Sequence, residues 1–263
     1  MFLLYAALSS VILLFFAYMI YKAHDDELKR EVVCDQRLSK SFDGYTIFFI
    51  ADIHRRTIKE HTLNQIDDEI HLVLIAGDLR ERGVPYKRTR NNIVKLKRWN
   101  APIYFVMGNN DYEGDYNRLQ TILKNEGVTI LNDRYDVIRK DGIEMELYGF
   151  DFYRNNEERP AFDWSKKPNT YRILLTHTPD SFYDLDGVKH EINLVFAGHT
   201  HGGQIRFGPI ALYPKGGISK DKQTYVIVTE GYGYSLLPFR LQTNAQCHII
   251  TLKKKEDTSS KMV

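Results

Sequence analysis

The chain has 263 residues, and 43% of them are hydrophobic, which is enough for one sizeable core or two small domains. Its 36 Lys and Arg residues nearly balance 34 Asp and Glu residues, which leaves a net charge of +2. This balance argues against an acidic disordered chain and against a nucleic-acid binder, whose basic excess is larger. We therefore expect no nucleic-acid partner.

The N-terminal residues 2–21 form an uninterrupted uncharged run. Such a run is long enough to cross a hydrocarbon core of roughly 30 Å. No Lys or Arg precedes it, and Tyr21-Lys22-Ala23 is a poor cleavage site, so a single-pass anchor over 1–22 is favoured over a cleaved signal peptide. Lys22, Lys29, Arg30 and Arg37 follow the run, and the positive-inside rule then predicts a cytoplasmic position for the rest of the chain at the cell membrane.

Beyond a charged stretch, predicted to be a linker over 23–42, short apolar runs alternate with amphipathic stretches. We expect one α/β domain over 43–254 and a flexible C-terminal tail over 255–263. The runs are strand-length and do not alternate with polar residues, as is typical of strands buried on both faces. The predicted strands are 45–51, 72–76, 103–107, 143–150, 172–176, 192–197, 225–229 and 246–252, and the predicted helices are 86–99 and 116–125.

Polar side chains follow five of these strands. Open α/β sheets place their sites at the carboxyl ends of strands, so these side chains are expected at one edge. Carboxylate oxygen and neutral imidazole suit Mn, Fe or Zn, and seven candidates are too many for one tetrahedral ion. In extended chain, residues two apart point to the same side, so each closely spaced pair can approach a pair of ions together. The candidate metal ligands are Asp52, His54, Asp78, Asn109, His177, His199 and His201.

The blocks Asp52-Ile53-His54, Gly77-Asp78, Gly108-Asn109-Asn110-Asp111, His177 and Gly198-His199-Thr200-His201 occur in the order of the calcineurin-like metallophosphoesterases. The segments 174–180, 198–209 and 231–240 resemble a bacterial membrane-associated branch, similar to UDP-2,3-diacylglucosamine hydrolase-like phosphoesterases. The resemblance implies a four-layer αββα sandwich and two divalent metal ions with a bridging hydroxide. It also implies that Asp52, His54 and His201 hold one ion, that Asn109, His177 and His199 hold the other, and that Asp78 bridges them.

Two positions depart from the family pattern. Asn110 stands where relatives have a histidine that protonates the departing oxygen, and an amide has no proton to give up at neutral pH. We therefore assign Asn110 a catalytic role limited to hydrogen bonding, with a preference for good leaving groups. Glu81 replaces a second aspartate that is not a metal ligand. Arg55, next to the first motif, either clamps a substrate phosphate or faces solvent.

These observations predict a hydrolase of phosphodiester or pyrophosphate bonds in a membrane-associated, lipid-linked substrate. The alternatives are an enzyme for soluble or cyclic nucleotides and a non-catalytic scaffold. The scaffold is disfavoured because degenerate relatives of that kind lose metal ligands, whereas every ligand position is filled here. The aromatic segment 232–239 has two interpretations, a mouth for acyl chains and ordinary core packing. The sequence leaves the oligomeric state open.

Overall fold

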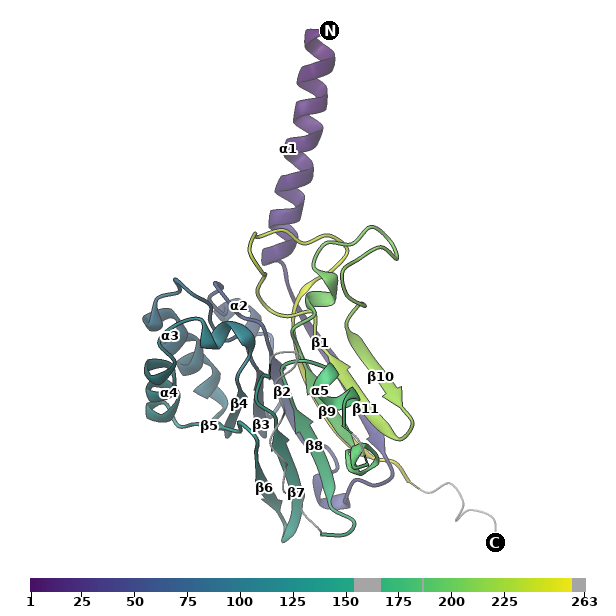
Figure 1. Ribbon diagram of the computed structural model, residues 1–263. Coiled ribbons are helices and arrows are strands. Elements are labelled where there is room, and N and C mark those ends of the chain that lie inside the picture. The colour runs from purple at the N-terminus through teal and green to yellow at the C-terminus, as the bar shows by residue number, and fades with distance from the viewer. Residues whose placement is uncertain (154–166, 186, 257–263) are drawn as a thin grey trace, which may run out of the picture.

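The computed structural model describes residues 1–153, 167–185 and 187–256, and in it two six-stranded sheets pack face to face below one long helix (Figure 1). In sheet order, the first sheet contains β1 (Asp26–Asp35), β12 (Ala245–Lys254), β2 (Thr46–Ile50), β3 (Leu72–Ala76), β4 (Ile103–Val106) and β5 (Val128–Ile130). The second contains β10 (Gly217–Asp221), β11 (Thr224–Val228), β9 (Leu194–Ala197), β8 (Tyr171–Leu175), β7 (Ile143–Gly149) and β6 (Arg134–Lys140). The helices are α1 (Phe2–His24), α2 (Glu60–Leu63), α3 (Tyr86–Leu96), α4 (Tyr116–Asn125) and α5 (Asp180–Tyr183).

Alternation along the strands divides the core into layers. Phe49 of β2 belongs to the cluster between the sheets, together with Phe196 of β9. The neighbouring Phe48 points the other way, into a cluster with Ile93 of α3 that covers the outer face of the first sheet. A third cluster packs Phe182 of α5 on the outer face of the second sheet. The molecule is therefore an αββα sandwich, as predicted.

The segment 23–42, predicted to be a linker, contains strand β1 instead. All ten residues of β1 pair in parallel register with β12, so this segment is the edge of the first sheet. Its sequence DELKREVVCD is rich in charge because an edge strand buries little of its surface. The predicted tail begins where β12 ends at Lys254, and its residues 257–263 lie outside the described part of the chain.

The end of the sandwich next to α1 is where the site-bearing strands finish. β2, β3 and β4 run parallel in the first sheet, and β8 and β9 run parallel in the second. Their carboxyl ends meet at the end of the sandwich that α1 joins (Figure 1). Among the described residues, α1 is the one helix long and apolar enough to span a membrane, with a mean hydropathy of 2.3.

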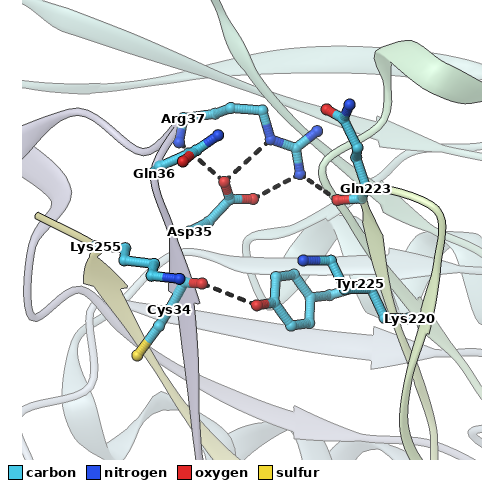
Figure 2. A pocket seen from close by; sticks show the side chains of 8 residues that line it. All are labelled: Cys34, Asp35, Gln36, Arg37, Lys220, Gln223, Tyr225 and Lys255. Carbon is cyan, nitrogen blue, oxygen red and sulfur yellow. Dashed lines mark hydrogen bonds and ion pairs between the residues drawn. The ribbon is translucent and has the colours of Figure 1, made fainter. Parts of the chain in front are cut away.

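The opposite end of the sandwich holds a joint between the two sheets. Arg37, just past β1, contacts the Asp35 carboxylate at 3.0 and 2.6 Å and also donates to the backbone oxygen of Gln223 (Figure 2). Tyr225 of β11 donates to the backbone oxygen of Cys34 at 2.9 Å. These contacts border a cavity of about 260 Å³ that contains none of the predicted site residues. Because Asp35 and Arg37 bind each other and join the two sheets, we assign these contacts a structural role.

Candidate metal centre

The two sheets bring the seven predicted ligands together at their shared edge. Asp52 and His54 follow β2, Asp78 follows β3 and Asn109 follows β4. From the second sheet, His177 follows β8, and His199 and His201 follow β9. Five of the seven residues are buried, and Asn109 and His199 are partly buried. The predicted convergence of distant residues is therefore present in the geometry.

One half of the cluster is formed by Asp52, His54 and His201. The two imidazole Nε2 atoms of His54 and His201 lie 3.1 Å apart. Oδ1 of Asp52 is 3.5 Å from Nε2 of His201 and 3.9 Å from Nε2 of His54. The three side chains thus aim one ligand atom each at a common point.

The other half contains Asn109, His177 and His199. Nε2 of His177 lies 3.1 Å from Oδ1 of Asn109 and 3.1 Å from Nδ1 of His199. Oδ2 of Asp78 stands between the halves, 3.4 Å from Nε2 of His177 and 3.6 Å from Nε2 of His54. This position is the one expected of a carboxylate that serves two cations.

The backbone around the ligands is unusual. Asp52, His54, Asp78, His199 and His201 all have positive φ, between 48° and 71°. Only a few per cent of non-glycine residues adopt this left-handed conformation, and such residues gather at functional sites. The extended geometry that the sequence suggested for the two closely spaced pairs is therefore wrong. Left-handed turns, rather than strand alternation, aim these side chains inward.

Glycines allow the close approach of the loops. A Cβ atom on Gly108 would lie 2.2 Å from Oδ1 of Asp78, and one on Gly198 would lie 2.6 Å from Oδ2 of Asp52. Any larger residue at either position would displace a carboxylate of the cluster.

The groups of the cluster differ in protonation. Burial opposes protonation of His177, but the charge of Asp78 outweighs it and raises the pKa of His177 to about 10, so a cation bound there would displace a proton. Burial raises the pKa of Asp52 to about 6. Burial also opposes ionisation of Asp78, but the charge and hydrogen bond of His177 outweigh it and hold the pKa of Asp78 below its usual range. Burial lowers the pKa of His199 to about 4, so that imidazole is neutral at physiological pH. An ionised carboxylate beside neutral imidazole is the state in which these groups bind metals.

A second layer of side chains supports the ligands, and the sequence analysis missed two of its members. Oε2 of Glu81 lies 3.2 Å from Nδ1 of His54, a contact that orients a histidine ligand. The sequence held one signal for a supporting role of Glu81, because this residue follows the candidate ligand Asp78 by only three positions. Arg55 pairs with the same Glu81 carboxylate and does not line the cavity at the cluster.

The other missed residue is Arg240, whose side chain is fully buried. Nη2 of Arg240 donates to the backbone oxygens of Glu230 at 2.6 Å and Gly233 at 2.7 Å, and lies 3.4 Å from Nδ1 of His201. The backbone N–H of Arg240 donates to the backbone oxygen of Met19 at 3.1 Å. Arg240 therefore links the loop behind the cluster to α1.

Asn110 contacts the central carboxylate. Its side-chain amide donates to Oδ2 of Asp78 at 2.6 Å, and its backbone N–H donates to Oδ1 at 2.8 Å. Asn110 also lines a cavity of about 390 Å³ above the cluster, which is large enough for a small ligand. The remaining lining residues include His54, Asp78, Asn109, His199, His201, Leu212, Tyr213 and Leu236.

The residues present fit a pair of divalent ions. Two buried carboxylates and four imidazoles converge in a small volume, and buried charges of this kind are stable only when paired or bound to metal. The donors are oxygen and nitrogen without thiolate, as suits Mn, Fe or Zn.

Comparison with known proteins gives the class. Residues 45–203 match the calcineurin-like phosphoesterase family model, and the chain belongs to this family of metal-dependent phosphate ester hydrolases. It is 36% identical over 211 residues to the uncharacterized protein YpbG of Bacillus subtilis, and the aligned region covers 79% of this chain and 80% of YpbG. It is 26% identical over 249 residues to the uncharacterized metallophosphoesterase YkuE of Bacillus subtilis, and the aligned region covers 88% of this chain and 86% of YkuE.

A solved structure, phosphopantetheinyl hydrolase from Mycobacterium tuberculosis, is similar with a TM-score of 0.46 and 12% identity. The similarity covers 73% of this chain and 91% of that one. A likeness at this level says nothing about the substrate of this chain. The chain is thus a phosphate ester hydrolase with a candidate metal-binding site, and its substrate is a phosphorylated compound.

Proposed function

We propose that this chain is a membrane-anchored enzyme that hydrolyses phosphodiester or pyrophosphate bonds of a lipid-linked substrate. The observation that carries the chemistry is the position of Asp78, whose Oδ2 lies within 3.6 Å of a histidine from each half of the cluster. When bound there, two divalent cations, Mn, Fe or Zn, supply hydroxide near neutral pH and neutralise phosphoryl oxygens.

The protein's own residues position the reaction. One ion would be held by Asp52, His54 and His201. The other would be held by Asn109, His177 and His199, and Asp78 would bind both ions. Asn110 holds Asp78 through two hydrogen bonds and also faces the cavity, where its amide is available to a substrate oxygen. The lipid link is supported by α1 and by the apolar Leu212 and Leu236 at the cavity wall.

To test this proposal, the turnover and the metal content of the chain are measured after purification with Mn. The parent is expected to hydrolyse aryl phosphodiesters and to hold about two ions per chain, and a panel of lipid pyrophosphates, phospholipids and cyclic nucleotides then identifies the substrate class. Asp78→Asn is expected to lower turnover by about 100-fold or more, since even changes outside the ligand set cost about 10–100-fold.

The matched control is Asp221→Asn, which alters a surface carboxylate paired with Lys189, away from the cluster. Its turnover should equal that of the parent. Unchanged turnover in Asp78→Asn, or less than about one bound ion per parent chain, would refute the two-metal proposal.

A further inference from the structure

Two loops that contribute to the wall of the cavity above the cluster carry exposed apolar side chains. One loop lies between His201 and β10 and the other between β11 and β12. Leu212 and Leu236 also line the cavity itself. We call this set the collar: Phe207, Ile210, Leu212, Leu236 and Leu237, with exposed fractions of 61%, 74%, 83%, 84% and 58%. Groups of exposed apolar residues of this kind mark surfaces that contact a partner or a membrane.

The loop of the collar that carries Leu236 and Leu237 lies beside the C-terminal part of α1. Phe239, two residues after Leu237, packs on Phe16 with ring centroids 5.5 Å apart. The backbone N–H of Arg240 donates to the oxygen of Met19, which is almost fully buried. Figure 1 shows the loop before β12 running alongside the base of α1. The loop is thus held level with the last two turns of the apolar run.

The length of α1 fixes where the membrane must end. Residues 2–15, which precede the contact with the loop, are about 21 Å long at about 1.5 Å per residue. A hydrocarbon core of roughly 30 Å needs about 20 residues, which is the whole run 2–21. A bilayer spanned by α1 must therefore reach Phe16 and Met19, and so also the level of Phe239.

We propose that the collar inserts into the headgroup–acyl boundary of the leaflet at the C-terminal end of α1, so that the cavity opens onto the membrane. The occupant of this surface is the lipid bilayer, because the collar continues the apolar surface of α1 at the depth that α1 sets. This deepens the proposed function, on which it rests, since a lipid-linked phosphate would reach the cluster without its acyl chains leaving the bilayer.

The direct test measures depth without catalysis. The full chain is placed in nanodiscs, and single variants Ile210→Trp and Leu237→Trp are compared with the parent, whose own tryptophans are subtracted. Lipids brominated near the headgroup end of the acyl chain should quench the added fluorescence, and its emission should shift to the blue. Ile143→Trp, at the start of β7 and the opposite end of the sandwich, is the matched control and should show neither change.

Two outcomes would overturn the proposal. Quenching at positions 210 and 237 no greater than at 143 would place the collar outside the bilayer. A blue shift without quenching, accompanied by dimers in the nanodisc, would assign the surface to a second copy of the chain.

A functional test separates this proposal from the proposed function. The double variant Ile210→Glu/Leu237→Glu should lose turnover of a lipid pyrophosphate in bilayers while hydrolysing soluble aryl phosphodiesters at the parent rate. Ile143→Glu/Ile218→Glu, which changes two exposed isoleucines away from the collar, should retain both activities. A parent inactive on every ester refutes the proposed function alone, whereas equal bilayer turnover in both double variants refutes insertion alone.

Discussion

At the scale of single residues, the candidate metal centre depends on a backbone conformation that residues other than glycine adopt only rarely. A non-glycine residue with a left-handed backbone costs on the order of 1–3 kcal/mol, and five of the seven proposed ligands have one. Such a concentration persists only where surrounding contacts enforce it. Here the backbone N–H of His199 donates to both carboxylate oxygens of Asp52, at 3.2 and 3.0 Å.

Glu81 is expected to act as a positioning residue through His54. Glu81→Gln removes the negative charge that faces Nδ1 of His54 and should weaken metal binding by about 10–100-fold, as changes beside metal ligands do. Titration of the metal-depleted chain with Mn measures the affinity. Glu126→Gln, which alters a carboxylate paired with Arg90 and Lys97 away from the cluster, serves as control. Equal Mn affinity in both variants would contradict the role.

Asn110 governs the choice of leaving group in our interpretation. Because its amide cannot protonate the departing oxygen, parent rates on aryl phosphodiesters should fall steeply as the leaving group becomes less acidic. Asn110→His should flatten that dependence, and Asn110→Ala, which removes the contact with Asp78, should lower every rate without flattening it. Rates that barely vary with leaving-group acidity in both the parent and Asn110→His would show that the argument is wrong.

At the scale of elements, strand β1 links α1 to the loops behind the site. Asp26, its first residue, accepts hydrogen bonds from Nη2 of Arg56 at 2.6 Å, from Thr62 at 2.6 Å and from the hydroxyl of Tyr232 at 2.5 Å. Burial opposes ionisation of Asp26, but the charge of Arg56 and these hydrogen bonds together lower its pKa. These hydrogen bonds therefore hold the edge strand at the end of the first sheet that lies next to α1 and the candidate metal centre.

Asp26→Asn should lower the free energy of unfolding by about 3 kcal/mol near neutral pH, because Arg56 is left buried without its partner. The pKa of Asp26 is lower in the folded chain than in the unfolded chain, where it is near 3.9. The ion pair therefore contributes its full stability above the unfolded-state pKa, and this contribution is lost as the pH falls through the folded-state pKa. The difference from the parent should therefore narrow below about pH 4.

Chemical denaturation in detergent, followed by near-ultraviolet circular dichroism, measures the difference. Asp68→Asn, which disrupts a partly exposed pair with Arg30, should cost less than about 1 kcal/mol. If Asp26→Asn and Asp68→Asn lower the free energy of unfolding by similar amounts, burial of the Asp26 pair does not add to stability.

At the scale of the whole molecule, α1 and the candidate metal centre share one end of the sandwich, and β12 ends at the other (Figure 1). Lys22, Lys29, Arg30 and Arg37 follow the apolar run, which favours a cytoplasmic domain. A fluorescent protein fused after β12 should therefore be fluorescent in cells, and alkaline phosphatase at the same position should be inactive. An active phosphatase fusion with a dark fluorescent one would place the domain on the opposite side.

The sequence by itself determined the family through the order of the motifs along the chain, and the resemblance to that family implied the sandwich. Metal binding restricts residue type at each strand end, so Asp52, Asp78 and the three later histidines carry the pattern in the chain itself. The fold class and the family are confirmed, whereas the roles of the individual residues stay predictions. Charged β1 gave no such signal, because an edge strand lacks the apolar run by which buried strands are recognised.

Tertiary structure decided what depends on contact between distant segments. The meeting of Glu81 with His54, of Arg240 with Met19 and of the collar with α1 leaves no local pattern in the sequence. The segment 232–239 had two interpretations, and the structure divides it, burying Tyr232 and exposing Leu236 and Leu237. The physical reason is that burial of a side chain depends on what the fold places against it, and only the folded path of the chain specifies that.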